Sequence, residues 1–473
     1  MEFNSFVWAL YKSSPAGQEA LEKHPADFQK MRSDKLSADE RAAEDRVQDE
    51  TQRWCASKTV NNAVQARQLF ETFVDNNEEV FVNIGPVSLA FHSTFPAFFA
   101  PYLFTRRFNT FQAICDTFGI PLLPPPKRPQ ERERSIYYLA INDALQEFRQ
   151  LQGLTSNELT AFLYDFAPKV LAADIGQELP PPTSVWFAIG GDPDYEFLNT
   201  ATISDPASWQ GNLSARRGDI VLMYRKAPLS HIESAWRIIE DGFSDPFFFY
   251  HTTIWIDQCV RFPPIKIKEL REHPKLGQNG IVRRDFVGAS GSRVPTEDYR
   301  AILTLLETKG FDSSQLLVPA SYEFEGAAQI EDEEDVEQTL VEPLLKRLGY
   351  QQSDWLKQMS LRMGRGERVY PDYALLAKTK HGDESAVILV EAKYHITTQK
   401  QLEDAFKQAK SYAWRLQSQA FLLAAMEGVW LFRIADRFSL KALDHFTWKA
   451  LEDPDQFQKL DLSVGKRNVT KSH

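Results

Sequence analysis

The chain contains a wholly apolar run, Ala386–Val390, that ends in the sequence Glu391-Ala392-Lys393. An apolar run of this length predicts a central strand in a sheet that is covered on both faces. Side chains two positions apart on a strand project from the same face. Glu391 and Lys393 are therefore expected side by side at the end of a buried strand, where a carboxylate and an ammonium are available for chemistry.

A second carboxylate, Asp372 in the dipeptide Pro371-Asp372, precedes Glu391 by nineteen residues. The segment 369–377 predicts the neighbouring strand, which begins near Asp372. Asp372 and Glu391 can hold one or two Mg²⁺ ions, or Mn²⁺ in their place, and the carbonyl of Ala392 is a further hard oxygen ligand. Such ions polarise a phosphate and lower the pKa of a bound water, while Lys393 can position that water or neutralise developing charge.

The flanking pattern predicts an α/β domain over 330–460. Segment 335–348 has apolar residues at helical spacing and segment 401–416 is a long helix after the central strand, with strands at 421–425 and 428–434.

Three further residues of these helices are candidates for the site. Gln408 and Tyr412 lie one turn apart on one helix face, where they can support Lys393 or contact a nucleic-acid backbone. Glu334, just before the first helix, is preferred over Glu337 as an additional carboxylate because of its spacing to Pro343.

These elements resemble the PD-(D/E)XK nuclease superfamily, in particular the nuclease domain at the N-terminus of type I restriction endonuclease subunits. The resemblance covers about 130 residues and rests on Glu334, Pro371-Asp372, Glu391-Ala392-Lys393, the Gln408/Tyr412 pair and the closing strand around Trp430. For any single element an edge-strand ion pair or a turn residue is the better explanation, but the five together in this order favour a nuclease. The sequence has no G-x-x-x-x-G-K-[ST] loop, so an ATP-driven motor is not implied.

The middle of the chain, 182–310, has a different texture. Short β-branched and aromatic runs at 184–190, 219–224, 234–239 and 252–260 alternate with turn residues, which is typical of strands.

This middle segment resembles the EVE/PUA-like fold, a small β-barrel that takes a flipped-out and often modified base into an aromatic pocket. The likeness rests on the runs around Trp186, Gly218-Asp219 and Ser230-His231. Base readout outside a duplex needs aromatic faces and a few hydrogen bonds, so the predicted base-binding residues are Trp209, Trp236, Trp186, Tyr224 and Ser230. The alternative is that these rings form the core of the barrel.

Residues 1–173 read as a mostly helical domain with a charged insert, and a structural or docking role is expected. The net charge of −11 opposes nucleic-acid binding in general, but Arg261–Arg300 carries nine Lys or Arg against five Asp or Glu. Three scattered cysteines (Cys55, Cys115, Cys259) indicate reduced thiols in the cytoplasm. No apolar stretch reaches the roughly 20 residues of a membrane-spanning helix.

The sequence thus predicts a multidomain α+β and α/β protein: a helical N-terminal domain, a central PUA/EVE-like β-barrel and a C-terminal PD-(D/E)XK domain. The predicted activity is that of a Mg²⁺-dependent DNA endonuclease that restricts modified phage DNA, similar to type IV-like restriction enzymes and independent of ATP. One site per chain implies a homodimer, at least on DNA. Two alternatives stay open: a structure- or RNA-directed nuclease without modification specificity, and a non-catalytic nucleic-acid-binding sensor.

Overall fold

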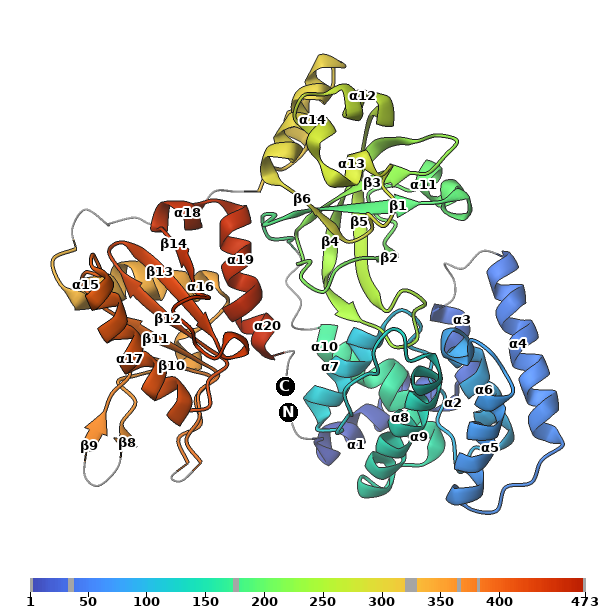
Figure 1. Cartoon of the computed structure of the whole chain (residues 1–473). Helices are drawn as coiled ribbons and strands as arrows, with labels where there is room; N and C mark the ends of the chain where they lie inside the picture. Colours follow the sequence, from blue (N-terminus) through green and yellow to red (C-terminus); the bar gives the residue numbers. More distant parts are fainter. Residues whose placement is uncertain are drawn as a thin grey trace. The chain divides into compact units, whose positions relative to one another are not determined.

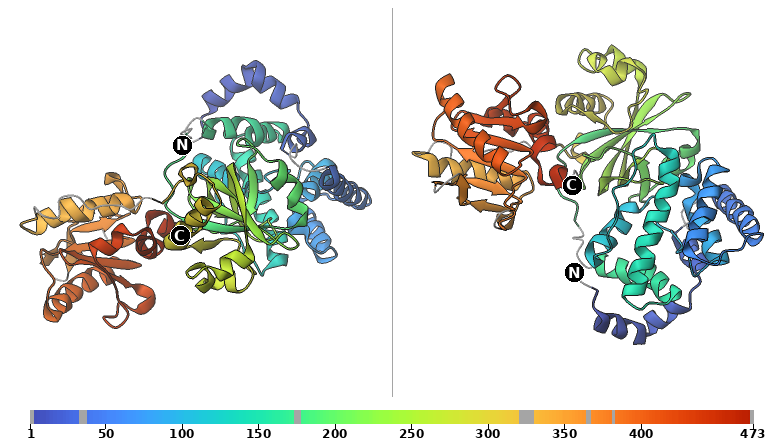
Figure 2. Two further views of the ribbon diagram at one scale, coloured as in Figure 1. Left: turned by 90° about the horizontal axis from the view of Figure 1, so that it is seen from above. Right: turned by 60° about the horizontal axis from the view of Figure 1, so that its bottom comes forward.

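The computed structural model describes residues 3–32, 38–172, 178–319, 330–363, 367–380 and 383–470. The chain is of the mixed α/β class, as expected, with two six-stranded sheets and many helices (Figures 1 and 2). Contacts divide it into two compact units, one comprising Met1–Pro180 with Trp186–Arg293 and the other Pro181–Val185 with Val294–His473. Within the described ranges, no helix combines the length and the apolar character needed to cross a membrane.

The first unit begins with a helical segment. The charged insert predicted near residues 35–52 is mostly a regular helix, α4. The helices are α1 (Ser5–Ser13), α2 (Pro15–Glu22), α3 (Pro25–Arg32), α4 (Ala38–Ala56), α5 (Ala63–Asp75), α6 (Ile84–Thr94), α7 (Phe108–Phe118), α8 (Glu131–Leu151), α9 (Ser156–Ala161) and α10 (Ala167–Ala172), with a π-helical turn at Phe162–Phe166.

The sheet of the first unit has the strand order β2-β5-β4-β3-β1-β6. Its strands are β1 (Val185–Gly190), β2 (Ala207–Gln210), β3 (Ile220–Arg225), β4 (His231–Ser244), β5 (Thr252–Lys266) and β6 (Ser292–Val294), with helices α11 (Tyr195–Thr200), α12 (Ile267–Glu272) and α13 (Gly280–Arg283). β4 and β5 form a long antiparallel hairpin. Phe243 and Phe247 at the far end of this hairpin are buried in the same apolar cluster as the helices. The end of the hairpin therefore packs into the core of the helical segment, while the rest of the sheet has an apolar cluster of its own.

The second unit holds a sheet of order β14-β13-β12-β11-β10-β7. Its strands are β7 (Trp355–Lys357), β10 (Tyr373–Leu375), β11 (Ile388–Ala392), β12 (Ala420–Ala425), β13 (Gly428–Arg433) and β14 (Asp444–Phe446), and β8 (Leu361–Met363) pairs with β9 (Glu367–Val369) as a separate hairpin. β11 lies at the centre and every residue in it is buried, which confirms the central strand.

Helices cover both faces of this sheet. The helices of the second unit are α14 (Thr296–Thr308), which lies apart from this sheet, α15 (Glu333–Val336), α16 (Glu342–Arg347), α17 (Gln399–Arg415), α18 (Trp448–Glu452), α19 (Pro454–Val464) and α20 (Lys466–Thr470), with a π-helical turn at Glu337–Val341. β11 is antiparallel to β10 and parallel to β12. Parallel neighbours need a crossover, and α17 supplies it. Apolar residues of α17 pack on one face, and those of α15, α16 and α18–α20 on the other.

One buried arginine ties helix α8 to the end of the β4–β5 hairpin. Arg134 is 1% exposed, and its guanidinium group lies over the ring of Phe81. It donates hydrogen bonds to the carbonyls of Pro246 (2.8 Å), Arg128 (3.1 Å) and Phe248 (2.6 Å). Removal of the side chain would leave the carbonyls of Pro246 and Arg128 without this donor, while the carbonyl of Phe248 would keep the N–H of His251 (2.7 Å).

We therefore expect Arg134→Ala to lower the free energy of unfolding by about 3 kcal/mol, because buried carbonyls are left without a donor. The matched control is Arg132→Ala on the same helix, where an exposed ion pair with Asp75 is lost and the free energy of unfolding should change far less. Urea unfolding followed by tryptophan fluorescence measures both variants. Equal losses would contradict this account of Arg134.

Candidate functional site

The register of two strands places Asp372 beside Glu391. β10 and β11 are antiparallel, with Tyr373 opposite Val390. The next positions outward are Asp372 and Glu391, and the N–H of Ala392 donates to Asp372 Oδ2 at 2.8 Å. Both carboxylates are buried, with exposures of 6% for Asp372 and 2% for Glu391. The two strands thus hold the predicted carboxylates together in the interior.

The Asp372 carboxylate also accepts a hydrogen bond from Gln358, a residue that the sequence did not indicate. Gln358 Nε2 donates to Asp372 Oδ1 at 2.9 Å, and its backbone N–H donates to the carbonyl of Asp372 at 3.1 Å. Gln358 follows the edge strand β7 and has a positive φ of 52°. A side chain from a third strand therefore fixes the orientation of the Asp372 carboxylate.

Glu391 is held by the helix that follows it. Gln408 Nε2 donates to Glu391 Oε1 at 2.6 Å and lies 3.2 Å from the hydroxyl of Tyr412. Lys393 Nζ donates to the same Glu391 oxygen at 3.2 Å. The structure thus brings together five residues that the sequence predicted: Asp372, Glu391, Lys393, Gln408 and Tyr412.

The additional carboxylate beside Lys393 is Glu333, not the preferred Glu334. Lys393 Nζ lies 3.3 Å from Glu333 Oε1, whereas Glu334 is exposed and accepts a hydrogen bond from Gln338. The reason is that Asp332 caps helix α15, which therefore begins two residues earlier than predicted. The expectation for Glu334 is corrected in this respect.

Glu337, the rejected alternative, also lies at the site. Residues four apart share one helix face, so Glu337 is on the same side of the helix as Glu333. It accepts a hydrogen bond from the hydroxyl of Tyr373 (3.1 Å) and pairs with Lys357 (3.4 Å). Burial, followed by the charge of Asp372, raises the pKa of Glu337.

The electric environment favours protonated acids and a charged lysine. Burial, and then the nearby Asp372, raises the pKa of Glu391 to about 7. Burial likewise raises the pKa of Asp372. For Lys393, burial favours the neutral amine, but the carboxylates of Glu391, Glu333 and Asp372 outweigh it and raise the pKa. At neutral pH the cluster holds an ammonium next to a carboxylate that is close to its own titration point.

The donor set at this cluster fits a hard divalent cation. Glu391 Oε2 is buried and accepts no hydrogen bond from the described residues. A buried carboxylate oxygen without a donor is costly unless something else compensates it. Each oxygen of Asp372 accepts one hydrogen bond, and the carbonyl of Ala392 accepts one from Lys393 Nζ (2.6 Å). Asp372 and Glu391, with the carbonyl of Ala392 as the predicted further ligand, are the residues that would hold Mg²⁺ or Mn²⁺, although the described part of the chain has no preformed group of three His, Cys, Asp or Glu ligands.

The predicted base-binding tryptophans form the core of the first unit's sheet. Trp186, Trp209 and Trp236 are buried in one apolar cluster. Their indole N–H groups donate within the protein: Trp186 to Asp219 (2.9 Å), Trp209 to the carbonyl of Ile189 (3.0 Å), and Trp236 to Ser234 (3.0 Å). Phe197 of α11 lies against the rings of both Trp209 and Trp236. The three indoles are buried and their N–H groups have partners within the protein, so the structure supports the alternative that these rings are packing residues.

Tyr224 and Ser230 are also accounted for by local contacts. The ring of Tyr224 stacks on that of Phe286, with centroids 4.0 Å apart. Ser230 is half-buried and shares a side-chain hydrogen bond with Tyr224. The two predicted residues therefore lie together, but the face of the Tyr224 ring is covered.

The raised pKa of Glu391 predicts a pH-dependent stability. Ionisation of Glu391 is disfavoured in the folded state, so the stability that its protonated form contributes is present below about pH 4.5 and is lost as the pH rises through about 7. Between pH 5 and pH 8 the wild type should therefore lose on the order of 2 kcal/mol more than Glu391→Gln. Thermal unfolding in EDTA measures this difference, and parallel pH profiles for the two proteins would contradict it.

Comparisons with known proteins identify no family for this chain. No protein-family model matches the sequence, and no curated protein matches it. Among solved structures, the NMR structure of Rpa0253 from Rhodopseudomonas palustris aligns with 26% of this chain and 94% of its own, at 14% identity and a TM-score of 0.24. A TM-score this low carries no argument about fold or function.

Proposed function

We propose that this chain is a Mg²⁺-dependent nuclease whose active site is the cluster around Asp372, Glu391 and Lys393. The observation that carries the proposal is the convergence of these residues with Gln408 in a buried cluster where one oxygen of Glu391 has no partner. The order of elements supports it as well: an antiparallel β10–β11 pair, the crossover helix α17 and the parallel strand β12 are the arrangement that the resemblance to PD-(D/E)XK nucleases implies.

The residues of the cluster divide the work of phosphodiester hydrolysis. A bound Mg²⁺ would polarise the phosphate and lower the pKa of a water molecule bound to it. Asp372 and Glu391 would bind the metal ion. Gln358 and the N–H of Ala392 orient the Asp372 carboxylate. Lys393 places an ammonium where negative charge builds up on the phosphoryl oxygens. Gln408 holds Glu391 in position.

Within this proposal the substrate is DNA, and the role is restriction of modified phage DNA by a chain that acts as a homodimer on its target. The resemblance of 182–310 to EVE/PUA-like domains supports that choice. One observation favours the alternative of a nuclease without modification specificity: Trp186, Trp209 and Trp236 are buried in one apolar cluster, and Phe197 packs against two of them. A non-catalytic sensor is the second alternative, and the complete set Asp372, Glu391 and Lys393 argues against it.

The first test is cleavage of linear duplex DNA with and without Mg²⁺. Wild type should cut only with the metal, and Lys393→Ala should cut at least about 100-fold more slowly, because an electrostatic contact to the transition state is lost. Lys449→Ala is the matched control, since Lys449 is an exposed lysine of the same unit that pairs with Glu452. Cleavage that survives Lys393→Ala unchanged would refute the assigned site.

A second test concerns the substrate and uses matched DNAs with unmodified, 5-methyl-, 5-hydroxymethyl- or glucosylated cytosine. Restriction of modified DNA predicts cutting of one modified form at least about tenfold faster than the unmodified form, since a site that reads a base edge discriminates by about 1–3 kcal/mol. Equal cutting of all four would retain the nuclease and remove the modified-base reader. No cutting of DNA, with cutting of RNA, would select the RNA-directed alternative.

A further inference from the structure

Two consecutive aromatic rings are exposed at the turn of the β4–β5 hairpin. Phe249 is 47% exposed and Tyr250 is 40% exposed, and their rings meet edge to face with centroids 5.1 Å apart. Phe247, two residues earlier, is buried among the helices of the first unit. The turn is therefore anchored on one side and presents two large rings on the other, an arrangement that packing within the chain does not account for.

Two arginines flank the neighbouring rings of Phe248 and Tyr250 at this turn. The guanidinium of Arg106 lies 5.6 Å from the ring of Phe248, and that of Arg128 lies 5.8 Å from the ring of Tyr250. The rings of Phe248 and Tyr250 are 5.6 Å apart. Both arginines are exposed, and within the described residues neither is in an ion pair, although Arg106 Nη1 donates a hydrogen bond to Ser208 Oγ at 3.3 Å. The four groups form a row of cation, ring, ring and cation in which Arg106, Tyr250 and Arg128 are exposed and Phe248 is half-buried.

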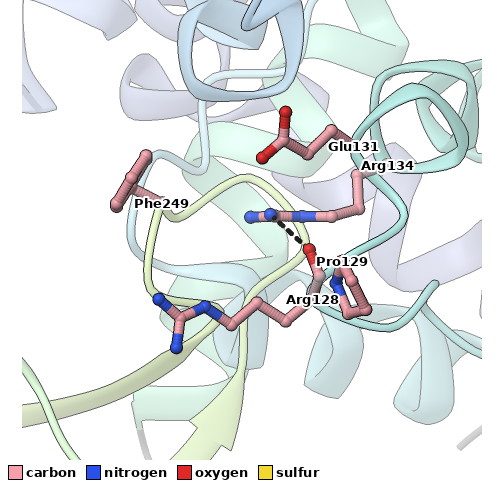
Figure 3. A pocket seen from close by; sticks show the side chains of 5 residues that line it. All are labelled: Arg128, Pro129, Glu131, Arg134 and Phe249. Carbon is pink, nitrogen blue, oxygen red and sulfur yellow. Dashed lines mark hydrogen bonds between the residues drawn. The ribbon is translucent and has the colours of Figure 1, made fainter.

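A cavity of about 180 Å³ opens beside this row (Figure 3). Figure 3 shows the ring of Phe249, the guanidinium groups of Arg128 and Arg134 and the carboxylate of Glu131 around one space. One wall of the cavity is the hairpin turn and the other is the segment just before and at the start of α8. Arg134 donates hydrogen bonds to carbonyls of both, and His251 Nε2 of the turn donates to the carbonyl of Pro126 at 2.7 Å. The walls are thus linked before any ligand arrives, which lowers the cost of ordering them on binding.

We propose that Phe249, Tyr250 and Arg128 form a binding site for unpaired nucleotides of a single-stranded or locally opened nucleic acid. A base stacks on the ring of Phe249 or Tyr250, and Arg128 and Arg106 pair with the flanking phosphates. Stacking on exposed aromatic rings beside basic side chains is how proteins bind single strands with little sequence preference. Bases inside a duplex have both faces covered by their neighbours, so the duplex is excluded as the ligand of these rings.

Charge favours nucleic acid over a protein partner at this surface. The row carries two guanidinium groups without ion pairs, and Glu131 is the carboxylate that lines the cavity. An anionic ligand with flat apolar faces satisfies both features. The choice of nucleic acid as the partner rests on the proposed function. The site itself does not, because it belongs to the first unit and takes no part in cleavage.

The test is binding of the full chain to a fluorescein-labelled single strand of mixed sequence and to the corresponding duplex, in EDTA so that nothing is cut. Phe249→Ser/Tyr250→Ser should weaken single-strand binding at least about tenfold and duplex binding less than about twofold. Phe249→Tyr/Tyr250→Phe keeps both rings and should bind as wild type. Leu151→Ser, which alters a 76% exposed apolar residue of the same unit, is the control for general surface changes.

Arg128→Ala provides an independent arm. It should weaken single-strand binding about threefold and reduce the slope of log affinity against log salt by about one. Arg132→Ala, on an arginine already paired with Asp75, should leave that slope unchanged.

Several results would overturn the proposal. These are no single-strand binding by wild type, unchanged binding after the double substitution, or equal losses for single strand and duplex. Loss of self-association by the double variant, with oligonucleotide affinity unchanged, would assign the rings to a protein interface instead. Ring-dependent binding by a chain that never cuts would uphold this site and refute the nuclease. Lys393-dependent cutting without ring-dependent binding would do the reverse.

Discussion

Two carboxylates buried side by side are the constraint around which the second unit is organised. Asp372 and Glu391 repel one another in an interior from which water is largely removed, so each must be compensated by donors. Four groups from three parts of the chain supply them: the N–H of Ala392, Gln358 after β7, Gln408 on α17, and Lys393. The compensation is incomplete at Glu391 Oε2. A divalent cation at Glu391 Oε2, as the proposed function requires, would complete the compensation.

The parts of the site that the sequence predicted are those set by local geometry. An apolar run with the period of a strand places Glu391 and Lys393, and the spacing of one helical turn places Gln408 and Tyr412. The antiparallel pairing of β10 with β11 then brings Asp372 next to Glu391. These rules depend on the few residues around each position, and therefore they hold without knowledge of the tertiary structure.

The parts that the sequence missed depend on contacts between distant segments or on small shifts of an element's ends. Gln358 reaches Asp372 because β7 pairs with β10. Glu333 replaces Glu334 because an aspartate cap moves the start of α15 by two residues, and no pattern in the apolar positions records that shift. The tryptophans of the first unit have the composition of a binding pocket and the burial of a core. Their burial, the internal partners of their indole N–H groups and the position of Phe197 against Trp209 and Trp236 separate the two, and all three depend on the tertiary structure.

The three hydrogen bonds of Arg134 also have a consequence for how this protein can change over time. They join the proline-rich connector before α8 to the turn of a hairpin whose strands belong to the sheet. A shorter or longer connector would displace the turn. A shifted hairpin register would leave the Arg134 side chain without its carbonyl acceptors. The helical segment and the hairpin must therefore be inherited and modified as one piece, and the helices of the first unit cannot be exchanged for another accessory domain without rebuilding the aromatic turn.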